Sequence, residues 1–530
     1  MNRERMLEQA RVRAEWDLLV IGGGATGMGI AVDAATRGYE VLLLEQHDFG
    51  KGTSSRSTKL VHGGVRYLEQ GNVALVMEAL KERGLLRKNA PHLVHELPFV
   101  VPSYTWWEGP FYGIGLKVYQ MLSGKLGFGT SRFISKEETL ERLPNVNPDG
   151  LRGGVIYYDG QFDDTRLLIH LAMTAAEQGA VLLNYAKVTA LEKGDDDLVH
   201  GVRWLDQETG ESHVARAKVV VNATGPFTDG VRGLAGETAE PMISPSQGAH
   251  LVLDRSFLPG ATAIMVPHTS DGRVMFAIPW HGRTLLGTTD VAVEEAALEP
   301  VAMEEEIGFM LTTAALYLHK KPTRDDVLSV FAGIRPLVKG GVGKNTAALS
   351  RDHTLHLDAN GLLSVTGGKW TTYRHMAEDA VNHAATLGDL PERPCVTKTT
   401  NLHGYHPHAH DLGDLAVYGT DAAAIQRLID EEPELGRRLD DALPYLAAEV
   451  VWAARSEMAR TVEDVLARRT RALFLDARAA LRMARPVAAL LARELGRDAA
   501  WQVAQVDAFG EVAAGYLPAG ACRNPGGVEK

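Results

Sequence analysis

The stretch from residue 17 to residue 45, DLLVIGGGATGMGIAVDAATRGYEVLLLE, restricts the fold of this chain more than any other part of the sequence. Residues 18–21 are continuously apolar, which predicts a strand buried on both faces. Residues 41–44 predict a second such strand, and a helix fits between the two. The turn after the first strand carries three glycines in G-x-G-x-x-G spacing, namely Gly22, Gly24 and Gly27. The sequence therefore predicts a βαβ unit of a parallel sheet.

This unit has the features of a dinucleotide site. The first glycine permits a tight turn, the second lets the backbone approach a pyrophosphate, and the third lets the helix pack close to the strand. The helix N-terminus offers free N–H groups and a positive dipole end to the pyrophosphate. Glu45 ends the second strand 18 residues after Gly27, close to the ~20 at which an acid meets ribose hydroxyls, although a tight turn in another α/β fold is the alternative. The predicted contacts are Gly22, Gly24, Ala25, Thr26, Gly27 and Glu45.

Composition narrows the remaining choices. A chain of 530 residues is too long for one core, so we expect two or three domains. A net charge of −12 argues against nucleic-acid binding. The two cysteines, Cys395 and Cys522, form neither a disulfide framework nor a metal-ligand spacing, so we expect no metal site and a reducing compartment. The first 16 residues lack the apolar core of a secretion signal, and no run approaches the ~18 apolar residues of a membrane-spanning helix.

Further segments carry a combination of motifs that is more specific than any one of them. They are GTSSRSTKLVHGGVRYLEQG (52–71), VNATGPF (221–227), FAIPW (276–280), GTTD (287–290), GIRPL (333–337) and GGKWTTYR (367–374). In this order, and with the N-terminal unit, they closely resemble the FAD-dependent glycerol-3-phosphate dehydrogenases, which are respiratory enzymes that reduce quinone. The resemblance covers about residues 15–500. It implies FAD as the cofactor and the oxidation of sn-glycerol 3-phosphate to dihydroxyacetone phosphate by hydride transfer to flavin N5.

The resemblance also implies a fold of the D-amino-acid-oxidase kind, which combines α/β and α+β architecture. Its parts are a Rossmann-like FAD-binding domain, an antiparallel-sheet substrate domain and a helical C-terminal domain. Strand-like runs such as HLVLD and VMFAIPW agree with the antiparallel sheet, and after about residue 395 the sequence has helical periodicity. The predicted division is a polar leader (1–16), a discontinuous FAD-binding domain (17–90, 150–235 and 360–385), a substrate-binding domain (91–149 and 236–359) and a helical C-terminal domain (395–520).

Several loops offer small residues that can approach the cofactor. Thr53, Ser54 and Ser55 bring small hydroxyl groups that can hydrogen-bond a phosphate or the flavin, although an ordinary turn has the same composition. Gly63 and Gly64 leave little side-chain bulk beside a flat ring. The remaining predicted cofactor contacts are Lys59, His62, Ala223, Thr224, Gly225, Gly287, Gly333, Gly368 and Lys369.

A phosphate substrate needs cationic donors, and Arg66, Arg335 and Arg351 are the candidates. Guanidinium groups bind phosphate oxygens in bidentate fashion, and several together can hold a dianion. The ordinary alternative for an arginine is a surface ion pair worth ~0–1 kcal/mol. The resemblance favours the phosphate role for Arg66 and Arg335, while both alternatives stay open for Arg351. The other predicted substrate contacts are Tyr67, His250, Lys369 and Thr372.

Two histidines are candidates for the base that removes the substrate hydroxyl proton. His62 is either that base, for which an ordinary pKa near ~6.5 is suitable, or a residue that packs against or hydrogen-bonds the flavin. His250 is the rival base, or else a strand histidine satisfied by the backbone. The sequence does not choose between them.

Lys369 follows two glycines at a predicted helix start. Reduction of FAD places negative charge near the pyrimidine end of the ring, which a lysine and a helix N-terminus would stabilise. The resemblance also implies that Lys369 contacts the substrate, and a capped helix with a solvated lysine is the alternative. The predicted catalytic set is His62, Arg66, His250, Arg335 and Lys369.

The electron acceptor and the location also come from the resemblance, which implies a membrane quinone and peripheral attachment to a membrane. The aromatic residues 106–128, with Lys117 and Lys125, can lie on a membrane surface, or form an ordinary surface or core segment. No EF-hand loop occurs in the C-terminal region, which argues against the calcium-regulated mitochondrial type and favours a cytoplasmic protein on the inner face of the cell membrane. The C-terminal helices can stabilise the protein, form a homodimer or dock a partner.

Rival activities share most of these motifs. A glycerol-3-phosphate oxidase would pass electrons to O2, and no residue decides against it. A 2-hydroxy-acid or amine oxidase of the same fold would bind a carboxylate, for which one arginine usually suffices. A flavin-binding protein without activity is the third rival, and the joint presence of His62, Arg66, Arg335 and Lys369 argues against it.

Overall fold

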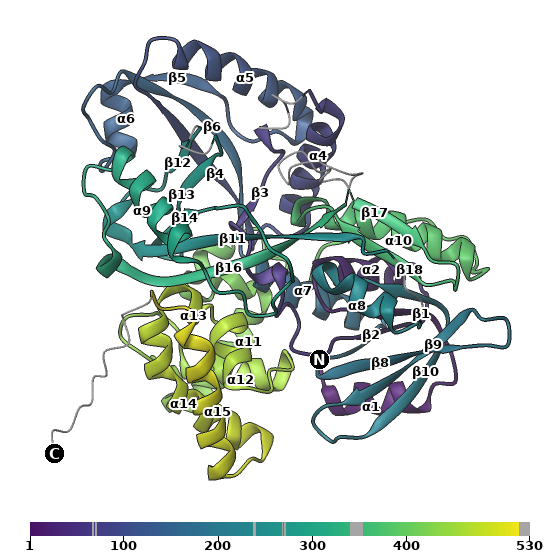
Figure 1. Cartoon of the computed structure of the whole chain (residues 1–530). Helices are drawn as coiled ribbons and strands as arrows, with labels where there is room; N and C mark the ends of the chain where they lie inside the picture. Colours follow the sequence, from purple (N-terminus) through teal and green to yellow (C-terminus); the bar gives the residue numbers. More distant parts are fainter. Residues whose placement is uncertain are drawn as a thin grey trace.

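The predicted βαβ unit forms the centre of a largely parallel sheet (Figure 1). The computed structural model describes residues 1–65, 68, 71–236, 240–267, 269, 272–339 and 353–518. The strand order is β17-β18-β10-β1-β2-β7, in which β17 is antiparallel to β18 and the others run parallel, while β8 and β9 extend β10 as an antiparallel ribbon. The bounds are β1 (Trp16–Ile21), β2 (Val41–Leu44), β7 (Val181–Leu183), β8 (Ala186–Lys193), β9 (Val199–Asp206), β10 (Ser212–Asn222), β17 (His353–Leu357) and β18 (Leu363–Gly367).

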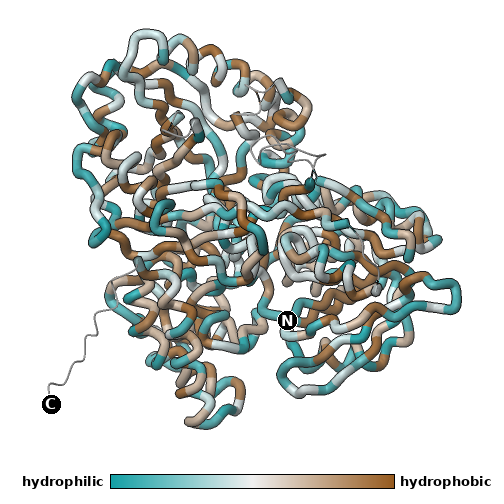
Figure 2. Tube along the Cα trace, viewed as in Figure 1, coloured by the Kyte–Doolittle hydropathy of each residue, from teal (hydrophilic) through white to brown (hydrophobic). Residues whose placement is uncertain are grey.

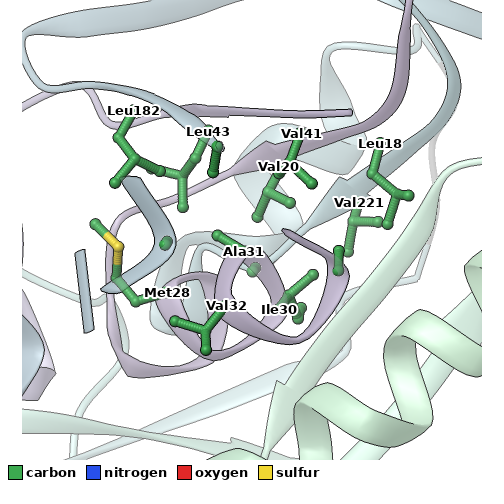
Figure 3. Packing of buried hydrophobic residues seen from close by; sticks show 14 of the residues in the cluster. Leu18, Val20, Met28, Ile30, Ala31, Val32, Val41, Leu43, Leu182 and Val221 are labelled. Atoms are coloured by element: carbon green, nitrogen blue, oxygen red, sulfur yellow. The ribbon is translucent and has the colours of Figure 1, made fainter. Parts of the chain in front are cut away.

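Helix α2 (Ala25–Thr36) packs its apolar residues on this sheet. Figure 3 shows Ile30 of α2 close to Val20 of β1 in a cluster of aliphatic side chains. Leu19 of β1 pairs with residues of β2 and β10 on its two sides and has no exposed surface. A Cβ at Gly27 would lie 1.9 Å from the carbonyl oxygen of Gly22, so only glycine lets the helix approach the strand this closely. The buried strand and the role of the third glycine therefore agree with the pattern of the sequence.

The second sheet is mainly antiparallel, as the runs HLVLD and VMFAIPW predicted. Its order is β15-β11-β14-β13-β12-β4-β6-β3, with β16 on β11, β5 on β6, and a parallel pair between β12 and β4. The bounds are β3 (Leu60–Val61), β4 (Val94–Ser103), β5 (Arg132–Ser135), β6 (Gly153–Phe162), β11 (Ile243–Asp254), β12 (Ala263–Val266), β13 (Met275–Trp280), β14 (Arg283–Gly287), β15 (Val291–Ala292) and β16 (Val327–Val338).

Helices surround the two sheets. The C-terminal helices α11 to α15 form one group, which packs against β16 (Figure 1). Among the residues that the structure describes, no helix combines the length and the apolarity needed to cross a membrane. The remaining bounds are α1 (Arg3–Val12), α4 (Val73–Asn89), α5 (Glu108–Leu122), α6 (Lys136–Arg142), α7 (Asp164–Glu177), α8 (Thr228–Gly233), α9 (Glu304–Tyr317), α10 (Tyr373–Leu387), α11 (Ala422–Glu431), α12 (Ala447–Ser456), α13 (Ala472–Leu475), α14 (Ala477–Leu495) and α15 (Ala499–Ala514).

The strands cross the predicted domain boundaries at several points. β3 and β6 fall within residues assigned to the FAD-binding domain, yet they pair with each other, and β6 with β4, in the second sheet. β17 falls within residues assigned to the substrate domain, yet it pairs with β18 in the first sheet. The expected polar leader contains α1, which buries Met6, Leu7 and Ala10 in the core. Apolar alternation identifies a strand but not the sheet that it joins, which accounts for these differences.

Candidate functional site

A cavity of about 550 Å³ lies where the two sheets meet. The turns after β1, β2, β10 and β18 contribute to its wall, and these are the carboxyl ends of parallel strands, where ligands bind in open α/β sheets. The strands β11 and β16 of the second sheet also contribute, with His250 and Arg335. The volume is that of a small-molecule or cofactor site.

The glycine turn after β1 leaves a helix N-terminus open to this cavity. Gly22 has a φ of 109°, and a Cβ there would lie 2.7 Å from the carbonyl oxygen of Ala223. Gly24 is the N-cap of α2 and gives no side-chain cap, and the first turn of the helix has no acidic residue. The N–H of Ala25 donates to the hydroxyl of Ser54 at 2.9 Å. A helix start of this kind, lined by glycine and without an acidic residue in its first turn, is suited to a phosphate group.

Glu45 lines the cavity at the end of β2. Its carboxylate accepts the N–H of Gly23 at 2.7 Å and the N–H of His47 at 2.8 Å. Burial raises the pKa of Glu45 above its ordinary value, and these two donors oppose the rise. The carboxylate is therefore fixed at the place where the sequence predicted a contact with a ribose.

The hydroxyl loop after β2 is divided between the cavity and the interior. Thr53 and Ser54 line the cavity. Ser55 is buried, and its hydroxyl donates to the carbonyl oxygen of Gly50. The structure thus turns Ser55, a predicted cofactor contact, away from the cavity, because a buried hydroxyl needs a partner and finds it in its own loop.

Lys59 is another predicted cofactor contact that the structure places elsewhere. Its ammonium group has no exposed surface and lies 2.6 Å from the carboxylate of Asp164. The rings of Trp280, Phe331 and Phe474 surround it at 5.1–5.4 Å. Burial lowers the pKa of Lys59 to about 7, against the opposite effect of Asp164. Lys59 therefore forms a buried ion pair behind the loop and does not line the cavity.

His62 lines the cavity, whereas the two glycines after it do not. The backbone N–H of His62 donates to the hydroxyl of Thr371 at 3.3 Å. The N–H of Gly63 donates to the Tyr119 hydroxyl at 2.7 Å, and a Cβ at Gly63 would overlap both Leu80 and Tyr119. Gly63 thus makes room for neighbouring side chains, and Gly64 follows in a left-handed conformation with a φ of 79°.

His250 lines the cavity from β11 in a tightly held position. Its ring stacks on Phe331 at 4.7 Å, and its Nε2 lies 2.9 Å from the hydroxyl oxygen of Thr58. Burial, and then the charges of Lys59 and Arg335, hold the pKa of His250 well below its ordinary 6.5. The imidazole is therefore neutral and can both donate and accept hydrogen bonds.

Gly287 was predicted as a cofactor contact, but it does not line the cavity. A Cβ there would lie 2.2 Å from Cδ2 of His250, so this glycine makes room for the imidazole. Gly333, by contrast, does line the cavity, and a Cβ there would lie 2.8 Å from Cβ of Arg56. The sequence predicted the same role for both glycines, but only Gly333 lies at the cavity wall.

Arg335 lines the cavity from β16 and is held by several acceptors. Its Nη1 donates to the carbonyl oxygen of Gln247 at 3.3 Å and to Asp290 at 3.2 Å, and its Nη2 donates to the carbonyl oxygen of Thr289 at 2.9 Å. A Cβ at Gly248 would lie 2.4 Å from Nη2, so the guanidinium lies directly over the backbone of β11. The cation is thus oriented before any ligand binds.

Lys369 and Gly368 line the cavity from the turn after β18. The indole N–H of Trp370 donates to the carbonyl oxygen of Ser54 at 2.9 Å, which joins this turn to the hydroxyl loop. Thr372, a predicted substrate contact, is buried, donates to the carbonyl oxygen of Lys369 and does not line the cavity. Its neighbour Thr371 lines the cavity in its place.

The other predicted residues divide into two groups. Residues 223–225 line the cavity from the turn after β10. Arg66, Tyr67 and Arg351 lie outside the described residues. The sequence did not single out Arg56 and Thr58, which also line the cavity. Both belong to the segment GTSSRSTK, but the conformation of a loop decides which of its side chains face inward.

Known proteins resemble this chain along almost its whole length. The family described as FAD dependent oxidoreductase matches residues 17–374, and the C-terminal domain of alpha-glycerophosphate oxidase matches residues 395–502. The glycerol-3-phosphate dehydrogenase of Bacillus halodurans, solved in complex with FAD, superimposes with a TM-score of 0.79 at 30% identity, over 97% of this chain and 98% of that one. Fold and cavity together define an FAD-dependent oxidoreductase.

Sequence relatives specify the family further. The mitochondrial glycerol-3-phosphate dehydrogenase of Arabidopsis thaliana is 44% identical, over 90% of this chain and 82% of the relative. That of Rattus norvegicus is 40% identical, over 93% and 72%. The chain belongs to the family of FAD-dependent glycerol-3-phosphate dehydrogenases. The resemblance drawn from the motifs, the fold class and FAD as the cofactor are thereby confirmed.

Proposed function

We propose that this protein oxidises sn-glycerol 3-phosphate to dihydroxyacetone phosphate with FAD and passes the electrons to a membrane quinone. The observation that carries this proposal is that His62, His250, Arg335 and Lys369 line the same cavity as the glycine turn of the dinucleotide unit. The relatives are named for this substrate. Converging cations suit a phosphate dianion, for which a single arginine would be a weak clamp.

The residues of the cavity fit FAD. Gly22 and Gly24 form a cradle that side chains would obstruct, since a Cβ would lie 2.7 Å from backbone at the first and 3.2 Å from Ser54 at the second. FAD, when bound, supplies the acceptor for the two electrons and the hydrogen that leave C2 of the substrate. The residues proposed to hold it are Gly22, Gly24, Ala25, Thr26, Glu45, Thr53, Ser54, Ala223, Thr224, Gly225, Gly333 and Gly368.

Arg335 and Lys369 are proposed to bind the substrate phosphate, together with Arg66 and, as a further candidate, Arg351. The Nη hydrogens of Arg335 already meet backbone oxygens, Asp290 and the hydroxyl of Thr288, so a phosphate that binds through these hydrogens must replace at least one of these contacts. The exchange favours a dianion, because its charge exceeds that of the carboxylate that it displaces. Orientation of the cation before binding lowers the entropy that substrate binding costs.

His62 is proposed as the base that accepts the C2 hydroxyl proton, and His250 as a hydrogen-bonding partner of the substrate. A general base works best when its pKa is near the working pH. The low pKa of His250 makes it a weak proton acceptor, since burial and two neighbouring cations disfavour the imidazolium. His62 is only half-buried at the cavity wall, so its burial is less complete than that of His250.

An anaerobic half-reaction tests the proposed function. The purified yellow protein is mixed with glycerol 3-phosphate in the absence of an acceptor, and the flavin absorbance is followed. Bleaching with this substrate, and not with glycerol, 2-hydroxy acids or amino acids, is the expected result. Quinone or O2 is then added to the reduced enzyme, and faster reoxidation by O2 would assign it as an oxidase. A flavin that stays oxidised with glycerol 3-phosphate would refute the substrate.

Helix α5 is proposed as the membrane contact of a peripheral, cytoplasmic-face enzyme. Its residues Tyr112, Leu116 and Tyr119 are buried, yet Ile114 and Met121 are 69% and 73% exposed on another face. Figure 2 shows apolar residues at the outer edge of the molecule where Figure 1 places α5. The other exposed apolar residues in and around this helix are Trp106, Trp107, Phe111, Val118 and Phe133. A helix that is apolar on its outer face suits a lipid surface.

Vesicle binding tests the role of α5. The double variant Ile114→Glu, Met121→Glu places two charges on the exposed face. As a control, Val503→Glu places one charge on an exposed apolar residue of α15. The α5 variant should no longer sediment with vesicles of phosphatidylethanolamine and phosphatidylglycerol, while it keeps FAD and reacts with a soluble dye. Unchanged sedimentation of the α5 variant would contradict the proposal. Protease protection in right-side-out and inverted membranes would test the side of the membrane.

A further inference from the structure

The loop that follows β2, residues 46–57 (the cofactor loop), has two faces. One face lines the cavity, through Gly52 and Ser54 among others. Apart from the short 3₁₀ helix Thr53–Ser55, the loop contains neither helix nor strand. A segment without a backbone ladder depends for its position on what is packed behind it. The second face of the loop therefore decides how firmly this part of the cavity wall is held.

Asp48 joins the second face of the loop to the helical turn Asp464–Arg469, which lies between α12 and α13. Its carboxylate is fully buried and accepts from Nη1 of Arg469 at 2.7 Å and from Nη2 at 2.9 Å. Arg468 donates to the same carboxylate through Nε. A paired fork of two hydrogen bonds fixes direction as well as distance. Asp48 and Arg469 are 421 residues apart, so this contact joins distant parts of the chain.

Arg471 holds the same face at a second point. Its Nη2 donates to the carbonyl oxygen of Ser55 at 3.1 Å, and its Nη1 donates to the hydroxyl of Thr165 at 2.7 Å. The backbone of Arg471 has a φ of 66°, in the left-handed region that a residue with a Cβ rarely adopts. Such a conformation persists where the surrounding contacts determine it, and here the contacts include the cofactor loop.

Two further pairs complete the attachment. The hydroxyl of Tyr516 accepts from Nη2 of Arg56 at 3.2 Å. The carboxylate of Glu463 lies 2.8 Å from the ammonium group of Lys51. Arg56 and Lys51 both line the cavity, so these contacts fix cavity-wall residues directly. Among the described residues, nothing C-terminal to residue 376 lines the cavity itself.

We propose that the C-terminal clamp, defined as Glu463, Arg468, Arg469, Arg471 and Tyr516, positions the cofactor loop and thereby sets how tightly FAD is held. Asp48 is the positioning residue on the loop, since it does not line the cavity and acts through the two arginines. The inference rests on the proposed function, because it requires the cavity face of the loop to contact FAD. It assigns the C-terminal helices a part in cofactor binding from a region that does not touch the cofactor.

The test compares Asp48→Asn with a matched buried pair elsewhere. Glu82 is also buried and accepts a fork from Arg374, through Nε at 2.7 Å and Nη2 at 2.8 Å, without touching the cofactor loop. Glu82→Gln therefore loses the same kind of charge without loosening the loop. For each holoenzyme the measurements are the rate of FAD release, from the rise in flavin fluorescence, the melting temperature, and the visible circular dichroism of the flavin at saturating FAD.

Asp48→Asn should release FAD about tenfold faster than Glu82→Gln at a similar loss of melting temperature, a difference equal to ~1.4 kcal/mol. Its flavin circular dichroism should also change at full occupancy, whereas that of Glu82→Gln should not. The clamp would be overturned if both variants released FAD at the same rate for the same loss of melting temperature. Should Asp48→Asn fail to fold, Tyr516→Phe removes one hydroxyl and should speed release about threefold, and an unchanged rate there would also overturn it.

A cavity-side variant separates the clamp from the proposed cofactor site. Gly52 lines the cavity, and a Cβ there meets no atom within 4 Å, so the first carbon of a side chain fits at this position and Gly52→Phe adds bulk to the loop. Normal FAD binding in Gly52→Phe would show that the loop does not contact FAD, and the site itself would be wrong. Weakened FAD binding in Gly52→Phe, together with equal behaviour of Asp48→Asn and Glu82→Gln, would refute the clamp and leave the proposed cofactor site in place.

Discussion

Gly287→Ala adds one methyl group behind His250 and removes no polar group. The added Cβ would lie 2.2 Å from Cδ2 of the imidazole, and ordinary contact begins near 3.4 Å, so the ring must move by about 1.2 Å. The ring has little freedom, because it stacks on Phe331 and hydrogen-bonds Thr58. Overpacking of this kind costs ~1–3 kcal/mol. A misplacement of ~1 Å in a substrate-contacting group can lower the rate about 10²-fold.

The expected result is a fall of about 10²-fold in kcat/KM for glycerol 3-phosphate with FAD content unchanged, since Gly287 does not line the cavity. Anaerobic rapid mixing measures the rate of flavin bleaching against substrate concentration. Gly308→Ala on α9 is the control, because a Cβ there meets no atom within 4 Å. Wild-type bleaching by Gly287→Ala would refute the placement of His250 at the substrate, and loss of FAD would restore Gly287 as a cofactor contact.

Three further predictions test other parts of the protein. Arg335→Ala should raise KM for glycerol 3-phosphate about 10²-fold with FAD still bound, since a truncated charge pair costs ~2–5 kcal/mol; Arg335→Lys should recover only part of this affinity in steady-state kinetics, because lysine lacks the planar fork. Gly22→Ala should yield a colourless protein, because its Cβ would meet the carbonyl of Ala223. The pKa of Glu463 lies at about 2, below its ordinary 4.5, because the charges of Arg468 and Lys51 outweigh burial. Above pH 4.5 this carboxylate contributes about 3 kcal/mol to the free energy of unfolding. The wild type should lose this contribution as the pH falls toward 2, whereas Glu463→Gln has no such contribution to lose. Denaturant unfolding at several pH values measures the difference. An unchanged KM, a yellow Gly22→Ala protein or parallel pH curves would contradict the respective prediction.

The dinucleotide unit could be predicted because its determinants are local. The apolar run of residues 18–21, the three glycines and Glu45 lie within one short stretch, and each has a conformational or packing reason that does not depend on distant residues. The structure places Gly22 in the left-handed region and packs Gly27 against the strand, as that reasoning requires. The antiparallel sheet and the C-terminal helices follow in the same way from periodicity.

Two of the errors concern residues whose role depends on a partner far along the chain. Lys59 has the charge of a phosphate ligand, but Asp164, which is 105 residues away, pairs with it in the interior. Gly287 has the character of a ligand-facing glycine, but the space that it leaves belongs to His250 on the neighbouring strand. Sequence shows the type of side chain, and only the fold shows which side of a loop or strand faces the cavity.

The buried charges between the cofactor loop and the C-terminal helices are the clearest instance. Aspartate and arginine are usually exposed, so no pattern would assign Asp48 and Arg469 to the interior. Burial of such a pair costs desolvation free energy, and the attraction between the charges offsets this cost only when their geometry is good. Apolar residues at the same positions could stabilise the fold equally well. What a forked ion pair adds is a defined relative position of its two partners. At Asp48 that position is the back of a cavity wall, which is why we infer that the C-terminal helices serve the cofactor site and not stability alone.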